Sequence, residues 1–341
     1  MPTALARRAD PLSARIAVVI PAFNVGAHLE AVIRTVPDFV ELVVVVDDAS
    51  RDDTFEVARR TVDPRVHVLR HERNTGVGGA MKSGYKKALE LGADIAVKMD
   101  GDGQMNPDHM PALIRPILLG HADYTKGNRF RDRAALRHMP LVRRVGNLGL
   151  SFLTKFAAGY WNVFDPTNGF TAIRREALEE IPFDSLADRY YFETSMLVWL
   201  NVLGAAVRDV PMPARYGEET SSLRVSHALF TFPFRLLASM VWRIWQKHFV
   251  ADFTAVALFL LLGTPLVLFG AGFGATYWVR SIATGHATTA GQVMIAGLPL
   301  LVGIQLLLQA FVMEISSVPQ MSSRGPLDGR AEAPTSPSRA E

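Results

Sequence analysis

Cysteine is absent from the 341 residues of this chain, and its absence excludes disulfide bonds and thiol catalysis. The chain also lacks a strong excess of positive or negative charge, because it has 36 basic and 33 acidic residues and a net charge of +3. Such a balance gives no reason to expect a nucleic-acid partner. Hydrophobic residues make up 49% of the chain and charged residues 20%, which allows a large core and excludes global disorder.

Several familiar signals are missing as well. Residues 1–14 are polar and lack an apolar segment, so we expect no signal peptide. No GxxxxGK[ST] occurs, which excludes a P-loop, and Met81 stands where a dinucleotide-binding loop at Gly76–Gly79 would need its third glycine. A phospho-acceptor receiver domain should start near its acidic pair, whereas a full strand and helix precede Asp47 and Asp48.

The most informative stretch that is present is Ile95–Gln104, which reads IAVKMDGDGQ. Asp100 and Asp102 point the same way in an extended segment, and two such carboxylates repel each other unless a cation or a proton lies between them. Mg²⁺ and Mn²⁺ prefer oxygen ligands and commonly bind one or two carboxylates together with substrate phosphates. The stretch therefore predicts phosphate chemistry at the end of a strand, with a solvent-exposed acidic turn as the alternative.

Apolar runs rich in Val and Ile alternate with helix-like stretches in the first part of the chain. The runs are Arg15–Ile20, Leu42–Val46, Val66–Leu69 and Asp94–Met99, and the helix-like stretches are Ala27–Val36, Asp53–Thr61 and Gly78–Leu91. This alternation predicts an α/β fold with a doubly wound parallel sheet.

Ligands bind at the carboxyl ends of the strands in such sheets. Polar groups follow all four runs, at Pro21–Asn24, Asp47 and Asp48, Asn74–Gly79, and Asp100 and Asp102. We expect a single cleft to collect them.

Two long uncharged segments lie near the C-terminal end, Thr254–Val279 and Thr288–Met313. Each exceeds the about 20 residues needed to cross a bilayer, and the short loop Arg280–Ala287 joins them. We expect a transmembrane hairpin over 251–315, with two buried helices of a soluble protein as the alternative. Glycines such as those in Gly263–Gly274 would let helices approach closely and support a homo-oligomer.

Basic residues flank the hairpin, Arg235, Arg243 and Lys247 before it and Arg324, Arg330 and Arg339 after it. The positive-inside rule therefore predicts an integral inner or plasma membrane protein whose N-terminal portion and tail are cytoplasmic.

The segment before the hairpin, 226–250, gathers its polar residues on one side of a helix. We interpret it as an amphipathic helix at the membrane interface with its cations near headgroups, and a helix that faces the core is the alternative. The tail, 316–341, is rich in Pro, Ser and Ala, and we expect it to be disordered.

Eight motifs in a fixed order extend the argument beyond composition. They are VVIPAFN (Val18–Asn24), VVDDASRDDT (Val45–Thr54), NTGVGGAMKSGYKKAL (Asn74–Leu89), MDGDGQMNP (Met99–Pro107), KGNRF (Lys126–Phe130), PLVRRVGN (Pro140–Asn147), DPTNGFTAIRREAL (Asp165–Leu178) and DVPMPARYGEETSSLR (Asp209–Arg224). With them the chain resembles the family-2 glycosyltransferases, and among these the polyprenol-phosphate sugar transferases of the dolichol-phosphate mannosyltransferase and undecaprenyl-phosphate glucosyltransferase type. The resemblance implies the GT-A fold over 15–225.

Departures from the family pattern are local. Val25 follows Asn24 where the family often has an acidic residue, Asn168 replaces the serine of a late SGF motif, and a Ser-Lys-Leu motif appears as Ser222-Leu223-Arg224. No QxxRW motif occurs, and two spans are few for a polymer channel, so a processive synthase is disfavoured.

The resemblance also implies roles for individual residues. Asp102 is expected to coordinate Mg²⁺ or Mn²⁺ with Asp100 beside it, and Asp165 and Glu193 are the other candidate catalytic residues. The candidate nucleotide-sugar ligands are Pro21, Ala22, Asn24, Asp47, Asp48, Gly76, Lys82, Asp100 and Gln104. The candidate ligands of the acceptor phosphate are Lys126, Arg129, Arg143, Asn147 and Arg224.

The reaction implied is metal-dependent transfer of one sugar, with inversion, from a UDP- or GDP-linked donor to a polyprenyl phosphate. A phosphate monoester has a second pKa of about 6, so it is ionised at neutral pH and needs cations rather than a general base. The alternative is transfer to a hydroxyl of a lipid-linked oligosaccharide or glycolipid, which would need Asp165 or Glu193 as a base. A non-catalytic nucleotide-binding or membrane scaffold is the remaining hypothesis.

Overall fold

The computed structural model describes residues 14–129, 141–166, 168–213 and 225–327, without the side chains of 141–148, 150 and 225–231. The polar segment predicted over 1–14 thus lies, except for its last residue, outside the described residues. The chain forms two units, one made of residues 1–240 and 319–341 and the other of residues 241–318. We call them the first and the second unit and describe each by itself.

A seven-stranded sheet forms the centre of the first unit, with the strand order β3-β2-β1-β4-β6-β5-β7. Its strands are β1 (Ile16–Ala22), β2 (Leu42–Asp47), β3 (Val66–Arg70), β4 (Ile95–Lys98), β5 (Tyr124–Asn128), β6 (Thr171–Arg174) and β7 (Val207–Pro211). Strands β1 to β4 pair in parallel, β6 is antiparallel to β4 and β5, and β5 is parallel to β7. The predicted α/β fold is confirmed, and its predicted parallel part comprises β1 to β4.

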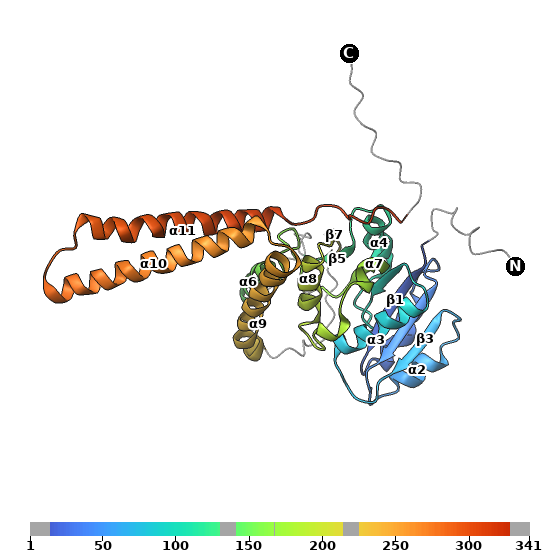
Figure 1. Cartoon of the computed structure of the whole chain (residues 1–341). Coiled ribbons are helices and arrows are strands. Elements are labelled where there is room, and N and C mark those ends of the chain that lie inside the picture. The colour runs from blue at the N-terminus through green and yellow to red at the C-terminus, as the bar shows by residue number, and fades with distance from the viewer. Residues whose placement is uncertain (1–13, 130–140, 167, 214–224, 328–341) are drawn as a thin grey trace, which may run out of the picture. The chain divides into compact units, whose positions relative to one another are not determined.

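Helices connect these strands (Figure 1). They are α1 (Gly26–Arg34), α2 (Thr54–Arg60), α3 (Val77–Glu90), α4 (Met110–Leu118), α6 (Leu141–Ala158), α7 (Arg175–Glu179) and α8 (Phe192–Val202), with short 3₁₀ turns at Pro107–His109 and Phe183–Ser185. The core between helices and sheet is made of strand residues such as Val18, Ile20, Val43 and Val45, all fully buried.

Helix α3 packs so closely on the sheet that it needs a glycine at the contact. A Cβ atom added to Gly84 would lie 2.2 Å from Val19 Cγ1 and 3.2 Å from Val46 Cγ2. Val19 and Val46 are stiff β-branched residues of β1 and β2, so neither side chain moves aside easily. The glycine therefore sets the distance between α3 and the strands whose ends carry the candidate site.

The edge strand β7 is covered by the segment that follows α6. Tyr160 Oη donates to the carbonyl of Ala205 at 2.6 Å, and Asn162 Nδ2 donates to the carbonyl of Val207 at 2.7 Å. The backbone N–H of Phe164 donates to Asp209 Oδ2 at 2.7 Å. Residues 160, 162 and 164 thus bond in turn to residues 205, 207 and 209, and the bond to Val207 occupies a backbone carbonyl that an edge strand would otherwise expose.

Helix α9 (Val225–Trp245) occupies most of the segment predicted to be amphipathic. Phe234 and Leu237 are 76% and 55% exposed, whereas Leu236 is 3% exposed and packs with Ala157 and Tyr191. The apolar residues are therefore divided between an exposed face and a face that packs within the first unit. Placement of the exposed face at a membrane interface stays a prediction.

The second unit contains the π-helix η4 (Gln246–Ala251) and the long helices α10 (Ala255–Thr284) and α11 (Ala290–Ser316), which lie side by side in Figure 1. Both long helices are long and apolar enough to cross a membrane. They approach closely where a Cβ on Gly303 would lie 2.8 Å from the carbonyl oxygen of Gly263. These glycines thus serve contact within the hairpin, and the predicted homo-oligomer stays a prediction.

The contacts of Glu314, near the end of α11, contradict one expectation about the basic residues before the hairpin. Glu314 forms an ion pair with Arg243, and its Oε2 lies 3.6 Å from Lys247 Nζ and 2.6 Å from His248 Nε2. We expected Arg243 and Lys247 to lie near lipid headgroups, but this was wrong for Arg243, which is 2% exposed. A buried cation needs a paired anion, and Glu314 supplies it.

The predicted disordered tail needs a second correction. Residues 319–327 belong to the first unit and form hydrogen bonds with it, for example from the N–H of Leu327 to the carbonyl of Leu118 at 3.0 Å. We call this segment the strap. The remainder of the predicted tail, 328–341, lies outside the described residues.

We predict that Gly84→Ala lowers the stability of the first unit by about 1–3 kcal/mol, because the added methyl group overpacks the contact with β1. Thermal unfolding of the purified protein in detergent measures this. Gly149→Ala is the matched control, since a Cβ there meets nothing within 4 Å. In an exposed helical position alanine should be neutral or stabilising by about 0.5–1 kcal/mol. Equal unfolding temperatures for the two variants would contradict the role of Gly84.

Candidate functional site

The carboxyl ends of β1, β2 and β3 lie next to one another because their registers match. Ala22 pairs with Asp47, and Asp47 pairs with Arg70. The N–H of Asp48 donates to the carbonyl of Ala22 at 2.8 Å, which continues the alignment into the loops. Pro21 and Ala22, both expected to contact nucleotide, therefore end β1 beside the acidic pair that ends β2.

Asp48 organises the loop before α3. Its Oδ1 accepts from the N–H of Thr75 at 2.9 Å and lies 2.7 Å from His71 Nδ1, and its Oδ2 accepts from the N–H of Gly76 at 2.7 Å. Burial opposes ionisation of this carboxyl, but the hydrogen bonds from Thr75, His71 and Gly76 outweigh it and hold the pKa of Asp48 below its usual value. Both oxygens are thus engaged in shaping the loop.

Gly76 begins that loop's turn into α3 with φ of +87°, a conformation that favours glycine. A Cβ there would also lie 2.7 Å from the carbonyl oxygen of Asp188. Lys82, a candidate nucleotide ligand on α3, forms an ion pair with Asp188 and donates to the carbonyl of Leu186 at 3.3 Å. In this structure Lys82 holds the 186–188 segment against α3.

Asn24 and Asp47 tie the first two loops together. Asn24 has φ of +53°, its N–H donates to Ser50 Oγ at 3.0 Å, and its Oδ1 accepts from the N–H of Arg51 at 2.9 Å. Asp47 is fully buried, and its Oδ1 accepts from the N–H of Ser50 at 3.2 Å. The two residues fix the β1 and β2 loops relative to each other.

A buried lysine joins two of the candidate acidic residues. Lys98 Nζ lies 3.0 Å from Asp100 Oδ1 and 3.0 Å from Glu193 Oε1, and its side chain is 3% exposed. Lys98 ends β4, so residue i+2 points to the same side and brings Asp100 onto the ammonium group. Glu193 comes from the first turn of α8. Burial alone would lower the pKa of Lys98, but Asp100 and Glu193 raise it well above its usual value.

Glycine at position 169 allows this ion pair to be covered by backbone. A Cβ on Gly169 would lie 2.5 Å from Lys98 Nζ and 2.9 Å from Asp100 Oδ2. The Asn168-Gly169-Phe170 motif therefore lies directly on the Lys98–Asp100 pair. Any larger residue at 169 would displace the carboxylate.

The candidate donor set for a divalent cation is Asp100 and Asp102, which the sequence predicted. Asp102 Oδ1 accepts from the N–H of Gln104 at 2.9 Å, and the Asp100 side chain is 32% exposed. Within the described ranges no group of three or more His, Asp or Glu side chains could hold a metal. Two hard carboxylates fit Mg²⁺ or Mn²⁺ held jointly with substrate phosphates, and they do not fit a closed structural site.

Asp165 is engaged by a second cation. It is fully buried, its Oδ2 lies 2.8 Å from Arg129 Nε, and its Oδ1 accepts from Arg129 Nη2 at 3.1 Å. Such a bidentate pair fixes both side chains in one plane. Arg129 is 36% exposed, so among the described side chains it is a candidate phosphate ligand with both a fixed position and access to solvent.

Lys126, also expected to bind the acceptor phosphate, is fully buried in β5 and donates to the carbonyl of Asn168. Burial lowers its pKa to about 8. Strand β5 thus places Lys126 inside the sheet rather than on the surface, and its role as a ligand of the acceptor phosphate stays a prediction. Of the other candidates, Arg143 and Asn147 are described for their backbone alone, and Arg224 lies outside the described residues.

A family model described as Glycosyl transferase family 2 matches residues 17–182. A UDP-N-acetylglucosamine–dolichyl-phosphate N-acetylglucosaminyltransferase of Methanococcus voltae is 34% identical over 218 residues, which are 60% of this chain and 86% of that protein. The chain belongs to the family 2 glycosyltransferases.

Other relatives of this glycosyltransferase have similar names. An undecaprenyl-phosphate mannosyltransferase of Micrococcus luteus is 32% identical over 58% of this chain and 82% of its own length. A polyprenol monophosphomannose synthase of Mycolicibacterium smegmatis is 31% identical over 58% of this chain and 76% of its own length.

Among solved structures, glucosyl-3-phosphoglycerate synthase from Mycobacterium tuberculosis, crystallised with Mn²⁺, UDP and glucosyl-3-phosphoglycerate, is similar with a TM-score of 0.52. The identity is 24%, over 71% of this chain and 84% of that chain. The likeness shows that this glycosyltransferase has the same GT-A fold, as the sequence predicted.

Two residues of the glycosyltransferase domain were missed by sequence reasoning. Lys98 could have been found from its place two residues before Asp100 in an otherwise apolar strand. Asp209 carries no such signal. Its Oδ2 accepts from Asn128 Nδ2 at 2.7 Å, while its Oδ1 is buried without a hydrogen-bond partner, and burial raises its pKa to about 6.

We predict that Asp209→Asn stabilises the protein at pH 7.5 by about 3 kcal/mol, the equivalent of a shift in the pKa of Asp209 from 3.8 to about 6. A raised pKa favours the protonated carboxyl in the folded state. That stabilisation is present below about pH 4 and is lost as the pH rises to about 6. The difference between wild type and variant should therefore shrink toward pH 4 in thermal unfolding. Asp184→Asn, at an exposed side chain, is the control and should show no such trend. Lower stability of Asp209→Asn at every pH would refute the assignment.

Proposed function

We propose that this glycosyltransferase transfers one sugar, with inversion, from a nucleotide-diphosphate sugar to a polyprenyl phosphate at the cytoplasmic face of a membrane. The proposal rests on the observation that both candidate bases are in ion pairs with cations. Glu193 is paired with Lys98, and Asp165 is paired bidentately with Arg129.

A carboxylate oxygen that already accepts from a cation is not free to take a proton from an acceptor hydroxyl. Both oxygens of Asp165 accept from Arg129 in this way, and Oε1 of Glu193 accepts from Lys98. An acceptor hydroxyl must lose a proton as it attacks, so it needs a base with a pKa near the working pH. An acceptor phosphate needs none, because it is already ionised. The pairing of both carboxylates therefore supports a phosphate acceptor over a hydroxyl acceptor.

The chemistry then requires bond exchange without proton transfer. An oxygen of the acceptor phosphate forms a bond to the anomeric carbon while the bond from that carbon to the nucleotide diphosphate breaks, and the electron pair leaves with the diphosphate. Direct attack on the face opposite the leaving group inverts the anomeric centre. Asp100 and Asp102 would hold a divalent cation that, when bound, stabilises the charge of the leaving diphosphate.

The relatives support the same acceptor class. The Methanococcus voltae, Micrococcus luteus and Mycolicibacterium smegmatis proteins are named for dolichyl phosphate, undecaprenyl phosphate and polyprenol respectively. The two apolar helices α10 and α11 would keep the enzyme in the membrane that contains such a lipid. Basic residues on both sides of the hairpin favour a cytoplasmic site.

Transfer to phosphate is tested with radiolabelled UDP- and GDP-sugars, Mg²⁺ or Mn²⁺, and vesicles that contain polyprenyl phosphate or the unphosphorylated polyprenol. We expect label in the lipid extract only with the phosphate. The rate should fall below about pH 6, where the acceptor phosphate gains its second proton. Label in polyprenol, or in a glycolipid in a manner abolished by Glu193→Gln, would instead establish hydroxyl transfer.

The metal role predicts that Asp102→Asn lowers turnover at least about a hundredfold, because it removes a charged ligand of the cation that stabilises the leaving group. Electron paramagnetic resonance of Mn²⁺ in the presence of UDP should show weakened binding. Asp108→Asn is the matched control, since Asp108 is an exposed carboxylate on the following 3₁₀ turn. Near-normal turnover of Asp102→Asn with an intact fold would remove the metal from the mechanism.

A further inference from the structure

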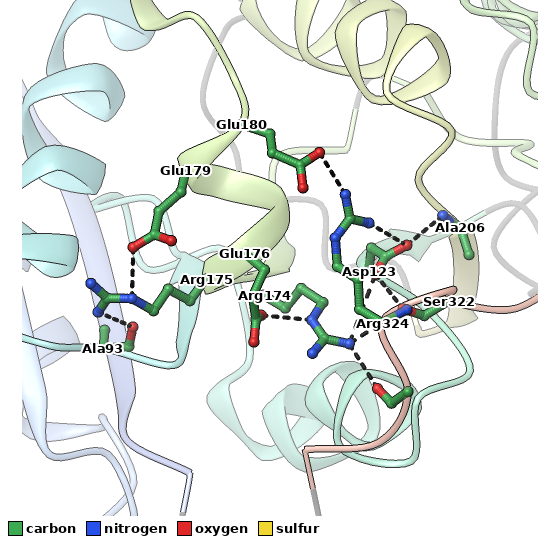
Figure 2. A network of polar contacts seen from close by, with 11 residues as sticks. Ala93, Asp123, Arg174, Arg175, Glu176, Glu179, Glu180, Ala206, Ser322 and Arg324 are labelled. Carbon is green, nitrogen blue, oxygen red and sulfur yellow. Dashed lines mark hydrogen bonds and ion pairs between the residues drawn. The ribbon is translucent and has the colours of Figure 1, made fainter.

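The strap, residues 319–327, binds a buried ionic cluster in the first unit (Figure 2). Ser322 Oγ donates to Asp123 Oδ1, and Arg324 Nη1 lies 3.3 Å from Asp123 Oδ2. Arg174 Nη1 donates to the carbonyl of Gly325 at 2.8 Å. Asp123 is fully buried and Arg174 is 2% exposed, so the strap supplies partners for two buried charges.

Backbone contacts seat the same segment. The N–H of Ser322 donates to the carbonyl of Gly120 at 3.2 Å. A Cβ on Gly120, whose φ is +69°, would lie 2.5 Å from the nitrogen of Pro326. At its outer end Arg324 Nη2 also lies 2.7 Å from Glu180 Oε2. The strap is therefore an integral part of the first unit, although the whole hairpin separates it from the rest in sequence.

The strap begins almost where the hairpin ends. Helix α11 ends at Ser316 and the strap begins at Pro319, so Ser317 and Val318 are the whole connection. Three peptide steps reach at most about 10 Å. The exit of the hairpin thus has a short covalent connection to a segment fixed by buried charges.

The chain that enters the hairpin is fixed to the first unit as well. In α9, Ser239 Oγ lies 2.8 Å from Tyr191 Oη, and the guanidinium of Arg235 lies 5.2 Å from the centre of the Tyr191 ring. Leu236 is buried in the same contact. Tyr191 directly precedes α8, whose first turn carries Glu193.

We propose that α9 and the strap are a two-point tether that restricts movement of the glycosyltransferase domain relative to its membrane hairpin. The tether makes transfer selective for acceptors embedded in the same bilayer. The catalytic part of this inference rests on the proposed function, whereas the restriction of movement does not.

The test lengthens the connection without removing any strap contact. Twelve Gly and Ser residues are inserted between Val318 and Pro319, and the same insertion between His286 and Ala287 in the hairpin loop is the matched control. Transfer to polyprenyl phosphate in vesicles is compared with transfer to a short-chain prenyl phosphate dissolved in detergent. The ratio of the two rates should fall about tenfold. The insertion lengthens the connection from about three to about fifteen residues, and the effective concentration of one tethered part near the other falls roughly as the −3/2 power of the connection's length. The loop insertion should leave the ratio unchanged.

A second measurement is independent of the acceptor. The chain has no cysteine, so Asp184→Cys and Asp252→Cys introduce unique spin-label sites in the two units. In lipid nanodiscs the distance distribution should be narrow without the insertion and broad with it. An unchanged distribution would overturn the tether. An unchanged rate ratio, or an equal loss with both acceptors, would overturn its effect on selectivity, and absence of transfer by the wild type would refute only the proposed function.

A side-chain variant separates the strap's contacts from its length. Arg324→Ala removes ion pairs to Asp123 and Glu180 and should broaden the distance distribution less than the insertion does. Arg175→Ala is its control, because the Arg175–Glu179 pair lies beside the cluster in Figure 2 without contacting the strap. Broadening by Arg175→Ala equal to that by Arg324→Ala would contradict the strap's role.

Discussion

Pairing of buried or half-buried carboxylates with cations is the constraint on which the rest of the site depends. A carboxylate removed from water is costly unless a cation or several hydrogen-bond donors face it. Lys98 meets this need for Asp100 and Glu193, and Arg129 meets it for Asp165. Once these pairs form, the acidic residues are fixed in position and the paired oxygens are occupied by cationic donors. The same pairs that stabilise the site therefore also restrict the chemistry it can perform.

The first half of the sheet could be predicted from the sequence, because burial of apolar strands alone determines its pattern. Strands β1, β2 and β4 are buried, nearly continuous apolar runs, β3 is a half-buried run at the edge, and the polar ends of all four identify the ligand edge of the sheet. Strands β5 and β7 read YTKGN and VRDVP, so their burial depends on partners that only the fold supplies. Lys126 illustrates the difference. The sequence predicts a ligand of the acceptor phosphate at this position and gives no sign that β5 buries the side chain inside the sheet.

The strap shows the limit of composition as a guide. Its Ser, Arg, Gly and Pro residues are typical of disordered tails. What orders it is the pair of Asp123 and Arg174, which lie far earlier in the chain and are buried without being apolar. A segment can therefore be ordered by unmet charge elsewhere in the fold, and no local pattern reveals that demand.

The strap and the site are linked through the same two strands. Asp123 immediately precedes β5, whose other end leads to Arg129, and Arg174 ends β6, which begins directly after Asn168–Phe170. Because β5 and β6 pair in antiparallel register, with Tyr124 opposite Ile173 and Lys126 opposite Thr171, they form a short rigid ribbon. One end of the ribbon binds the segment that leaves the membrane hairpin, and the other end presents the groups around Asp100 and Asp165. The strap and the candidate site therefore lie at opposite ends of one strand pair, and paired backbone rather than a loop separates them.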